Sequence, residues 1–157
     1  MSIAGTGLII VLSALAALHF YWGFGGFWPG TDSRSLSERV AGTSRNVASN
    51  FASCALVATA LLAAAAIVFA GQGSLQYGLP ELIVYGGYAT LILVFGLRGV
   101  APYLTPVFNY ARGTPFFDLN RRYYAPLCLV IAAALVFDYP AGLDGAMADL
   151  FDNGLAL

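Results

Sequence analysis

Histidine is the side chain best suited to proton transfer or metal ligation near neutral pH, and the 157-residue chain has one, His19. It lies in an apolar stretch, about one helical turn from the expected membrane interface. His19 could relay protons or ligate a metal or haem, but a haem would need a second ligand of another type or from a partner chain. No acidic residue or cysteine lies beside it, so we predict no metal site and can name no cofactor. The competing interpretation is a histidine that hydrogen-bonds to a neighbouring helix or a lipid headgroup.

Two carboxylates, Glu81 and Asp138, form a second candidate site. Each lies about one turn inside the end of an apolar stretch, where an ionisable group is costly and is a functional hypothesis by default. If their helices are neighbours, the pair could share a proton or bind a cation. The alternative is that each side chain reaches the outer headgroups, with Glu81 stabilised by the helix N-terminus that it occupies after Pro80.

Three arginines form a third candidate site. Arg98 closes one apolar stretch, and Arg121 and Arg122 precede the next. Together they could hold an anionic lipid or a phosphate-bearing molecule in a basic pocket. The simpler interpretation is that they mark the cytoplasmic side and extend their side chains into the headgroup layer.

The distribution of basic residues predicts how these groups are positioned. All seven are arginines, and they gather in two segments, 24–45 and 98–122. Arginine and lysine are enriched in cytoplasmic loops, so we predict an all-α membrane protein with four transmembrane helices in one bundle. Both arginine segments would lie inside and both termini outside. The four predicted spans cover residues 3–23, 46–70, 79–97 and 123–140.

Local signals add detail to this arrangement. Thr31 or Asp32 could cap a short surface helix that Gly42 ends. Small residues along the second span predict that it lies at the centre of the bundle, because they allow close helix approach in lipid. Leucine, methionine and phenylalanine along 143–157 predict a short amphipathic helix on the outer surface.

Composition excludes several classes of protein. Hydrophobic residues make up 59% of the chain and charged residues 10%, whereas soluble domains have about a quarter charged. We expect one membrane domain over 1–157, embedded in the lipid bilayer of a bacterial inner membrane, and no nucleic-acid partner. The first apolar stretch exceeds the roughly 7–15 residues of a signal-peptide core, so we expect it to be retained. Cys54 and Cys128 are expected to be buried apolar residues.

Two stretches have a distinctive composition. The first reads LHFYWGFGGFWP over 18–29, and the second reads NRRYYAPLCL over 120–129. They resemble the two signatures of an uncharacterised bacterial family of small four-helix membrane proteins, defined only as a domain of unknown function. Ala125 stands where that family's pattern has serine, which argues against a hydroxyl role there. The resemblance implies a four-span fold over nearly the whole chain and supplies no activity, cofactor or partner.

In the predicted topology both stretches lie at the inner interface, so the first and fourth spans could meet there. That would gather the candidate ligand site at one end of the bundle. The site comprises His19, Trp22, Arg98, Arg121, Arg122, Tyr123 and Tyr124.

Three functions are compatible with these features. The leading one is a non-catalytic accessory or assembly subunit of a membrane complex, which associates with other membrane subunits or with itself. It rests on small size, a small-residue helix face and the lack of H-E-x-x-H, desaturase-type histidine clusters, G-x-S-x-G or a P-loop. The first alternative is a membrane enzyme or binding protein for a lipophilic or anionic lipid-like ligand at the inner interface. The second is a small proton- or cation-coupled transporter that uses Glu81 and Asp138.

Overall fold

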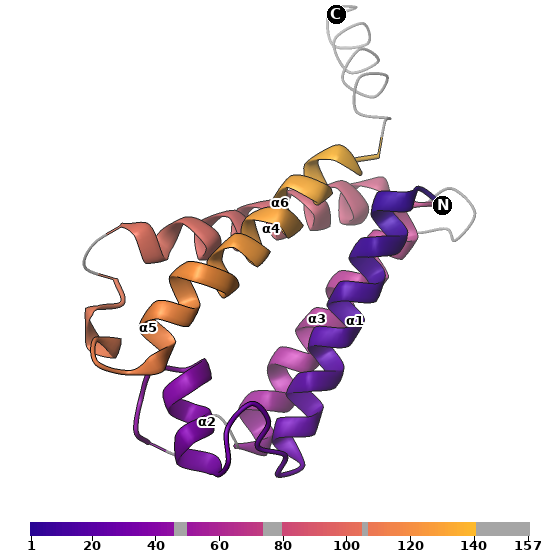
Figure 1. Ribbon diagram of the computed structural model, residues 1–157. Coiled ribbons are helices and arrows are strands. Elements are labelled where there is room, and N and C mark those ends of the chain that lie inside the picture. The colour runs from indigo at the N-terminus through magenta and orange to yellow at the C-terminus, as the bar shows by residue number, and fades with distance from the viewer. Residues whose placement is uncertain (46–49, 74–79, 105–106, 141–157) are drawn as a thin grey trace, which may run out of the picture.

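The computed structural model describes residues 1–45, 50–73, 80–104 and 107–140. Within these ranges the chain is all helical, without strands (Figure 1). The elements in chain order are α1 (Ile3–Gly23), α2 (Ser33–Val40), α3 (Phe51–Gly71), α4 (Glu81–Val100), the 3-10 turns η2 (Ala101–Tyr103) and η3 (Asn109–Ala111), α5 (Pro115–Leu119), the π-helical turn η4 (Asn120–Tyr124) and α6 (Ala125–Phe137). The predicted tail helix over 143–157 and the start of the second predicted span, 46–49, lie outside the described residues.

Three helices are long and apolar enough to cross a membrane: α1, α3 and α4. They have 21, 21 and 20 residues, so each extends about 30 Å, the thickness of the hydrocarbon core. The first turns of α1 and α3 are capped by side chains that accept from free backbone amides. Ser2 Oγ accepts from Gly5 N at 2.8 Å, and Asn50 Oδ1 accepts from Ser53 N at 3.1 Å. The chain is thus built to associate with a membrane.

The fourth predicted span does not reach this length in the described part of the chain. α6 has 13 residues and extends about 20 Å, so three helices rather than four meet the requirement. α5 and η4 continue the helical path before it. In η4 the amide of Ala125 donates to the carbonyl of Asn120, five residues earlier. This wider turn avoids the clash that the ring of Pro126 would make with the carbonyl four residues before it in a regular α-helix.

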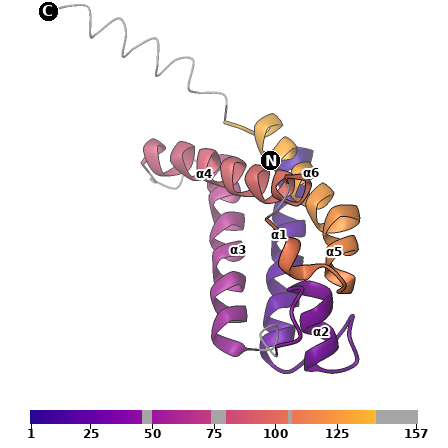
Figure 2. The ribbon, with the colours of Figure 1, turned by 90° about the vertical axis from the view of Figure 1, so that its left-hand side faces the viewer.

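The four long helices form two hairpins, in which α1 lies along α3 and α4 lies along α6 (Figure 1). The hairpins meet at one end and diverge toward the other, and α4 runs crosswise to α3 in Figure 2. This arrangement differs from the predicted single bundle. Glycines fix the close approaches: a Cβ added to Gly99 of α4 would lie 2.6 Å from Leu129 and 3.1 Å from the Ala125 carbonyl oxygen of α6.

The two ends of the molecule differ in what fills them. We call the end at which the hairpins meet, marked by Ser2, Gln72 and Asp138, the Asp138 end. We call the opposite end, which holds α2, Arg98, η4 and α5, the arginine end. All four long helices contribute to the main hydrophobic core, which comprises Leu8, Leu12, Ala64, Ala65, Val68, Ala70, Val84, Tyr88, Ile131 and Leu135.

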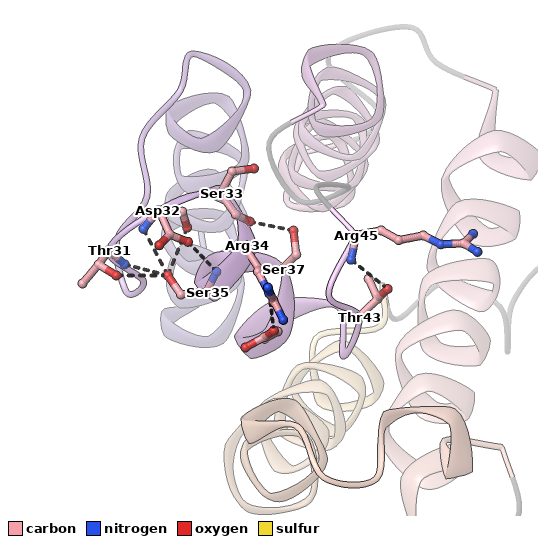
Figure 3. Close-up of polar contacts among 9 residues, drawn as sticks. Thr31, Asp32, Ser33, Arg34, Ser35, Ser37, Thr43 and Arg45 are labelled. Atoms are coloured by element: carbon pink, nitrogen blue, oxygen red, sulfur yellow. Dashed lines mark hydrogen bonds and ion pairs between the residues drawn. The ribbon is translucent and has the colours of Figure 1, made fainter.

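The short helix α2 is capped by Asp32, as one of the two predicted caps. Asp32 Oδ1 accepts from the Ser35 amide at 2.7 Å, and the Ser35 hydroxyl in turn accepts from the Asp32 amide at 3.1 Å (Figure 3). The bond from the Ser35 amide, followed by that from its hydroxyl, lowers the pKa of the Asp32 carboxyl. In the same helix, Arg34 Nε lies 3.1 Å from Glu38 Oε1 in an exposed ion pair across one turn.

The turn after α2 joins the two hairpins at the arginine end. Gly42 has a φ of +69°, and a Cβ there would lie 2.5 Å from the Ala111 Cβ and 2.7 Å from Phe116. Next to it, Tyr110 OH donates to the Ala41 carbonyl at 3.4 Å, and Tyr124 OH donates to the Arg39 carbonyl at 3.3 Å. The predicted helix stop at Gly42 is therefore confirmed, and the same glycine permits the contact with the second hairpin.

Candidate functional site

Asp138 is the most extensively hydrogen-bonded carboxylate of the described residues. It directly follows α6, is 8% exposed and accepts three hydrogen bonds from three other helical segments. Gln72 Nε2 donates to its Oδ2 at 2.7 Å, Tyr88 OH donates to the same oxygen at 2.9 Å, and Ser2 Oγ donates to Oδ1. These four residues form what we call the Asp138 cluster.

The partners of Asp138 are placed by the ends of their helices. Ser2 is the N-cap of α1, Gln72 directly follows α3, and Tyr88 lies two turns into α4. Close approach is possible because Gly71 has no side chain: a Cβ there would lie 2.6 Å from the Tyr88 ring. A buried acceptor with this many donors ties the two hairpins together at the Asp138 end, because leaving buried polar groups unpaired is costly.

Glu81 does not take part in this cluster. It is exposed in the first turn of α4, and the hydrogen bonds of the described residues include none between Glu81 and Asp138. Glu81 and Asp138 therefore do not form a hydrogen-bonded pair in the described residues. The position of Glu81 agrees with a helix N-terminal role.

His19 and Trp22 line a cavity of about 150 Å³ between α1, the end of α2 and α3. His19 Nδ1 lies 2.7 Å from the Leu15 carbonyl oxygen, and Trp22 Nε1 donates to the Trp28 carbonyl at 2.7 Å. The two rings meet edge to face with centroids 4.9 Å apart. The remaining lining residues are Val40, Ala41, Ser53, Cys54 and Val57.

Arg98 lies near the C-terminal end of α4, above an aromatic ring. Its Cζ is 5.3 Å from the centroid of Phe108, a favourable cation–π geometry. Its Nη1 is buried without a hydrogen-bond partner, and so is the Oδ1 of Asn120, which is 1% exposed. In the part of the chain that the structure describes, these are the two buried side-chain polar atoms left unpaired.

Arg121 and Arg122 are exposed on η4. The guanidinium of Arg121 lies 5.8 Å from the ring centroids of Tyr103 and Phe117, and that of Arg122 lies 5.5 Å from Tyr123. An arrangement of exposed arginines on aromatic rings suits the headgroup layer of a membrane. Tyr123 is exposed beside them, whereas Tyr124 is half-buried against α2.

The structure does not gather the predicted ligand residues into one cavity. His19 and Trp22 lie on the first hairpin, whereas Arg98, Arg121 and Arg122 lie on the second. α2 stands between them: Val40 and Ala41 line the His19 cavity, while the carbonyls of Arg39 and Ala41 contact tyrosines of the second hairpin. Sequence reasoning missed Ser2, Gln72 and Asn120. In the sequence, Ser2 is a polar residue just before the first apolar run, and Gln72 is one just after the second.

Comparison with known proteins identifies a family for the chain. No curated protein and no solved structure matches the chain. A protein-family model matches residues 12–135, a range that includes both distinctive stretches, 18–29 and 120–129. Because the match covers well over half of the chain, it establishes the family to which the chain belongs. The chain belongs to the family described as "Protein of unknown function (DUF3995)".

Proposed function

We propose that this protein is a non-catalytic accessory or assembly subunit of a larger complex in the bacterial inner membrane. One observation carries the proposal: α3 has a face of small side chains that nothing in the described structure covers. In lipid, association of helices depends on close packing rather than on the hydrophobic effect, so small residues favour contact with a partner helix.

The geometry of α3 separates this face from its internal contacts. Ala52, Thr59, Ala63 and Ala66 are exposed and lie within about 60° of one another around the helix axis. The opposite side of α3 is buried, through Cys54, Ala58, Ala65 and Val68. The small residues of α3 predicted a position at the centre of the bundle, but α3 is not at the centre of the fold. It retains a surface on which a further helix could pack.

The hydrogen bonding of the polar groups supports a non-catalytic role. Asp138 is engaged with Ser2, Gln72 and Tyr88, which join the hairpins, and His19 Nδ1 is engaged with a carbonyl of its own helix. The arginines at the other end lie on aromatic rings in the manner of membrane-interface residues.

The test compares Ala63→Leu with Ala60→Leu by native mass spectrometry of protein extracted mildly from its own membranes. Ala60 is also exposed on α3 but lies about 60° from Ala63 and about 90° from the middle of the small-residue face. We expect wild type and Ala60→Leu to carry the same partner subunit, and Ala63→Leu to lose it or to hold at least about tenfold less, because a leucine prevents close approach. A wild-type protein that is monomeric or only self-associated would refute the assignment, as would full retention by Ala63→Leu.

The proposal includes a topology with four crossings. The fourth would be the continuous helical path of α5, η4 and α6, with the arginine end in the cytoplasm and the Asp138 end outside. Arginines at the ends of α4 and η4 support this orientation. A tilt of both hairpins in opposite directions would be compatible with transmembrane helices, which tilt up to about 40°.

Cysteine labelling tests this orientation. In a background of Cys54→Ala and Cys128→Ala, exposed positions Thr31 and Glu81 are replaced singly by cysteine. A membrane-impermeant maleimide should label Glu81→Cys in intact spheroplasts and Thr31→Cys only after the membrane is opened. The reverse pattern, or labelling of both in intact spheroplasts, would contradict the proposed topology.

A further inference from the structure

We propose that the cavity lined by His19 and Trp22 binds a single-ring aromatic alcohol, of the phenol or hydroquinone class, with the ligand hydroxyl donating to His19 Nε2. This inference goes beyond the assembly role and does not depend on it. It follows from the size of the cavity, from the hydrogen bonds that fix its two rings, and from the kind of polar group that it offers.

The size of the cavity limits the ligand. Its volume is about 150 Å³, and an enclosed cavity of about that volume in another protein accommodates one benzene ring, so the part of a ligand that lies inside is of single-ring size. A haem or a multi-ring pigment is far larger. Because the cavity is open on one side, a substituent of the ring could extend away from it. Apolar walls from Val40, Ala41 and Val57 suit such a ring better than a free ion.

The hydrogen bond of His19 decides what its ring can offer. The Leu15 carbonyl can only accept, so the proton of that 2.7 Å contact must be on His19 Nδ1. In the neutral imidazole this leaves Nε2 with a lone pair, which accepts hydrogen bonds. Anchoring one ring nitrogen to a carbonyl also orients the other, as it does for ligand-binding histidines.

The other polar groups in the wall are engaged with the protein. The indole N–H of Trp22 donates to the Trp28 carbonyl, and the Ser53 hydroxyl lies 3.3 Å from Asn50 Oδ1. The cavity therefore offers an acceptor in His19, and a ligand that donates fits it better than one that only accepts. An alcohol is preferred over its ether or ketone. The rings of Trp22 and His19 can make stacked or edge-to-face contacts, which favour a flat aromatic ligand.

The test uses the fluorescence of Trp22 as a report on the cavity. The chain has two tryptophans, and Trp28→Phe leaves Trp22 as the only one while keeping the backbone carbonyl that holds its indole. In this background, 4-hexylphenol is titrated into protein in liposomes and compared with 4-hexylanisole, which cannot donate, and with 4-hexylcyclohexanol, which is not aromatic. We expect 4-hexylphenol to bind about three- to tenfold more tightly than the anisole, the value of one net hydrogen bond, and more tightly than the cyclohexanol.

Three variants link the binding to the cavity. His19→Phe keeps a ring but removes the acceptor, so the preference for phenol over anisole should disappear. Val57→Phe fills the cavity and should lower binding of all three probes at least about tenfold, whereas Leu56→Phe, 72% exposed before substitution and outside the cavity, should bind as the parent does. Helical circular dichroism and a single elution peak confirm folding of each variant.

Three results would overturn the proposal. These are equal affinity for the phenol and the anisole in the parent protein, unchanged binding by Val57→Phe, or binding of 4-hexylcyclohexanol as tight as that of the phenol. If His19→Phe does not fold, the comparison of probes and the Val57→Phe result still decide the outcome.

Discussion

Asp138→Ala is expected to lower the free energy of unfolding by about 2–4 kcal/mol. The substitution leaves Ser2, Gln72 and Tyr88 without their shared acceptor. An unpaired buried donor, here Tyr88, costs about 1–3 kcal/mol in soluble proteins, whereas the exposed Ser2 and the half-buried Gln72 lose less. Hydrogen bonds between membrane helices average nearer to about 0.6 kcal/mol. The loss should be measured by unfolding in mixed micelles with increasing sodium dodecyl sulfate, followed by circular dichroism.

Two further variants separate hydrogen bonding from simple packing at this position. Asp138→Asn keeps an oxygen that accepts from Gln72 and Tyr88, and its amide can donate to the Ser2 hydroxyl, so it should cost less than about 1 kcal/mol. Tyr88→Phe removes one donor and should cost about 1 kcal/mol. If Asp138→Ala unfolds at the same detergent fraction as wild type, the cluster does not stabilise the junction of the hairpins.

Gly42→Ala should have an effect of similar size at the opposite end. The left-handed backbone at φ +69° costs an alanine about 1–2 kcal/mol, and the added methyl group would lie 2.5 Å from the Ala111 Cβ and 2.7 Å from Phe116. Overpacking of this kind costs about 1–3 kcal/mol. The summed loss of unfolding free energy, about 2–5 kcal/mol, should appear in the same unfolding assay. Proteolysis should also become faster where the turn after α2 packs against α5.

Gly113→Ala is the matched control for this prediction. Gly113 also has a positive φ, +86°, but a Cβ there would meet nothing within 4 Å. It should therefore cost about 1–2 kcal/mol from backbone strain alone. Equal losses in the two alanine variants would mean that the contact between the Gly42 turn and the second hairpin contributes little.

The sequence predicts the existence of the helices well and their ends less well. α1 has the predicted bounds, Ile3–Gly23, because an apolar run and a change to Gly and aromatic residues coincide there. α4 continues beyond its predicted end at residue 97 to Val100, since hydropathy changes at Arg98 whereas the helix stops only where Pro102 disfavours it. Asn50, which caps α3, similarly lies inside the predicted span.

The arrangement of the helices was beyond the reach of the sequence signals. Hydropathy assigns residues to the membrane but does not set a crossing angle, which depends on contacts such as that of Gly99 with α6. For the same reason α2 was predicted as a helix but not as the element between the two hairpins. His19 and Trp22 lie together because they are three positions apart, on one face of the helix.

The polar cluster shows a related limit. Asp138 stands out in the sequence because a carboxylate in an apolar run is unusual, but its partners are ordinary residues from chain positions 2, 72 and 88. Their significance comes from long-range packing. Ser2, at the start of α1, and Gln72, at the end of α3, meet because the two helices are antiparallel.

The wide turn η4 has a consequence for the far end of the second hairpin. A π-helical turn holds one residue more than an α-helical turn, so it sets the rotational phase of everything after it, by about 100° for one residue. Asp138 thus faces Ser2, Gln72 and Tyr88 because of a turn at residues 120–124. A single insertion or deletion in that turn would leave the local helix intact but would turn the Asp138 carboxylate away from its partners at the Asp138 end.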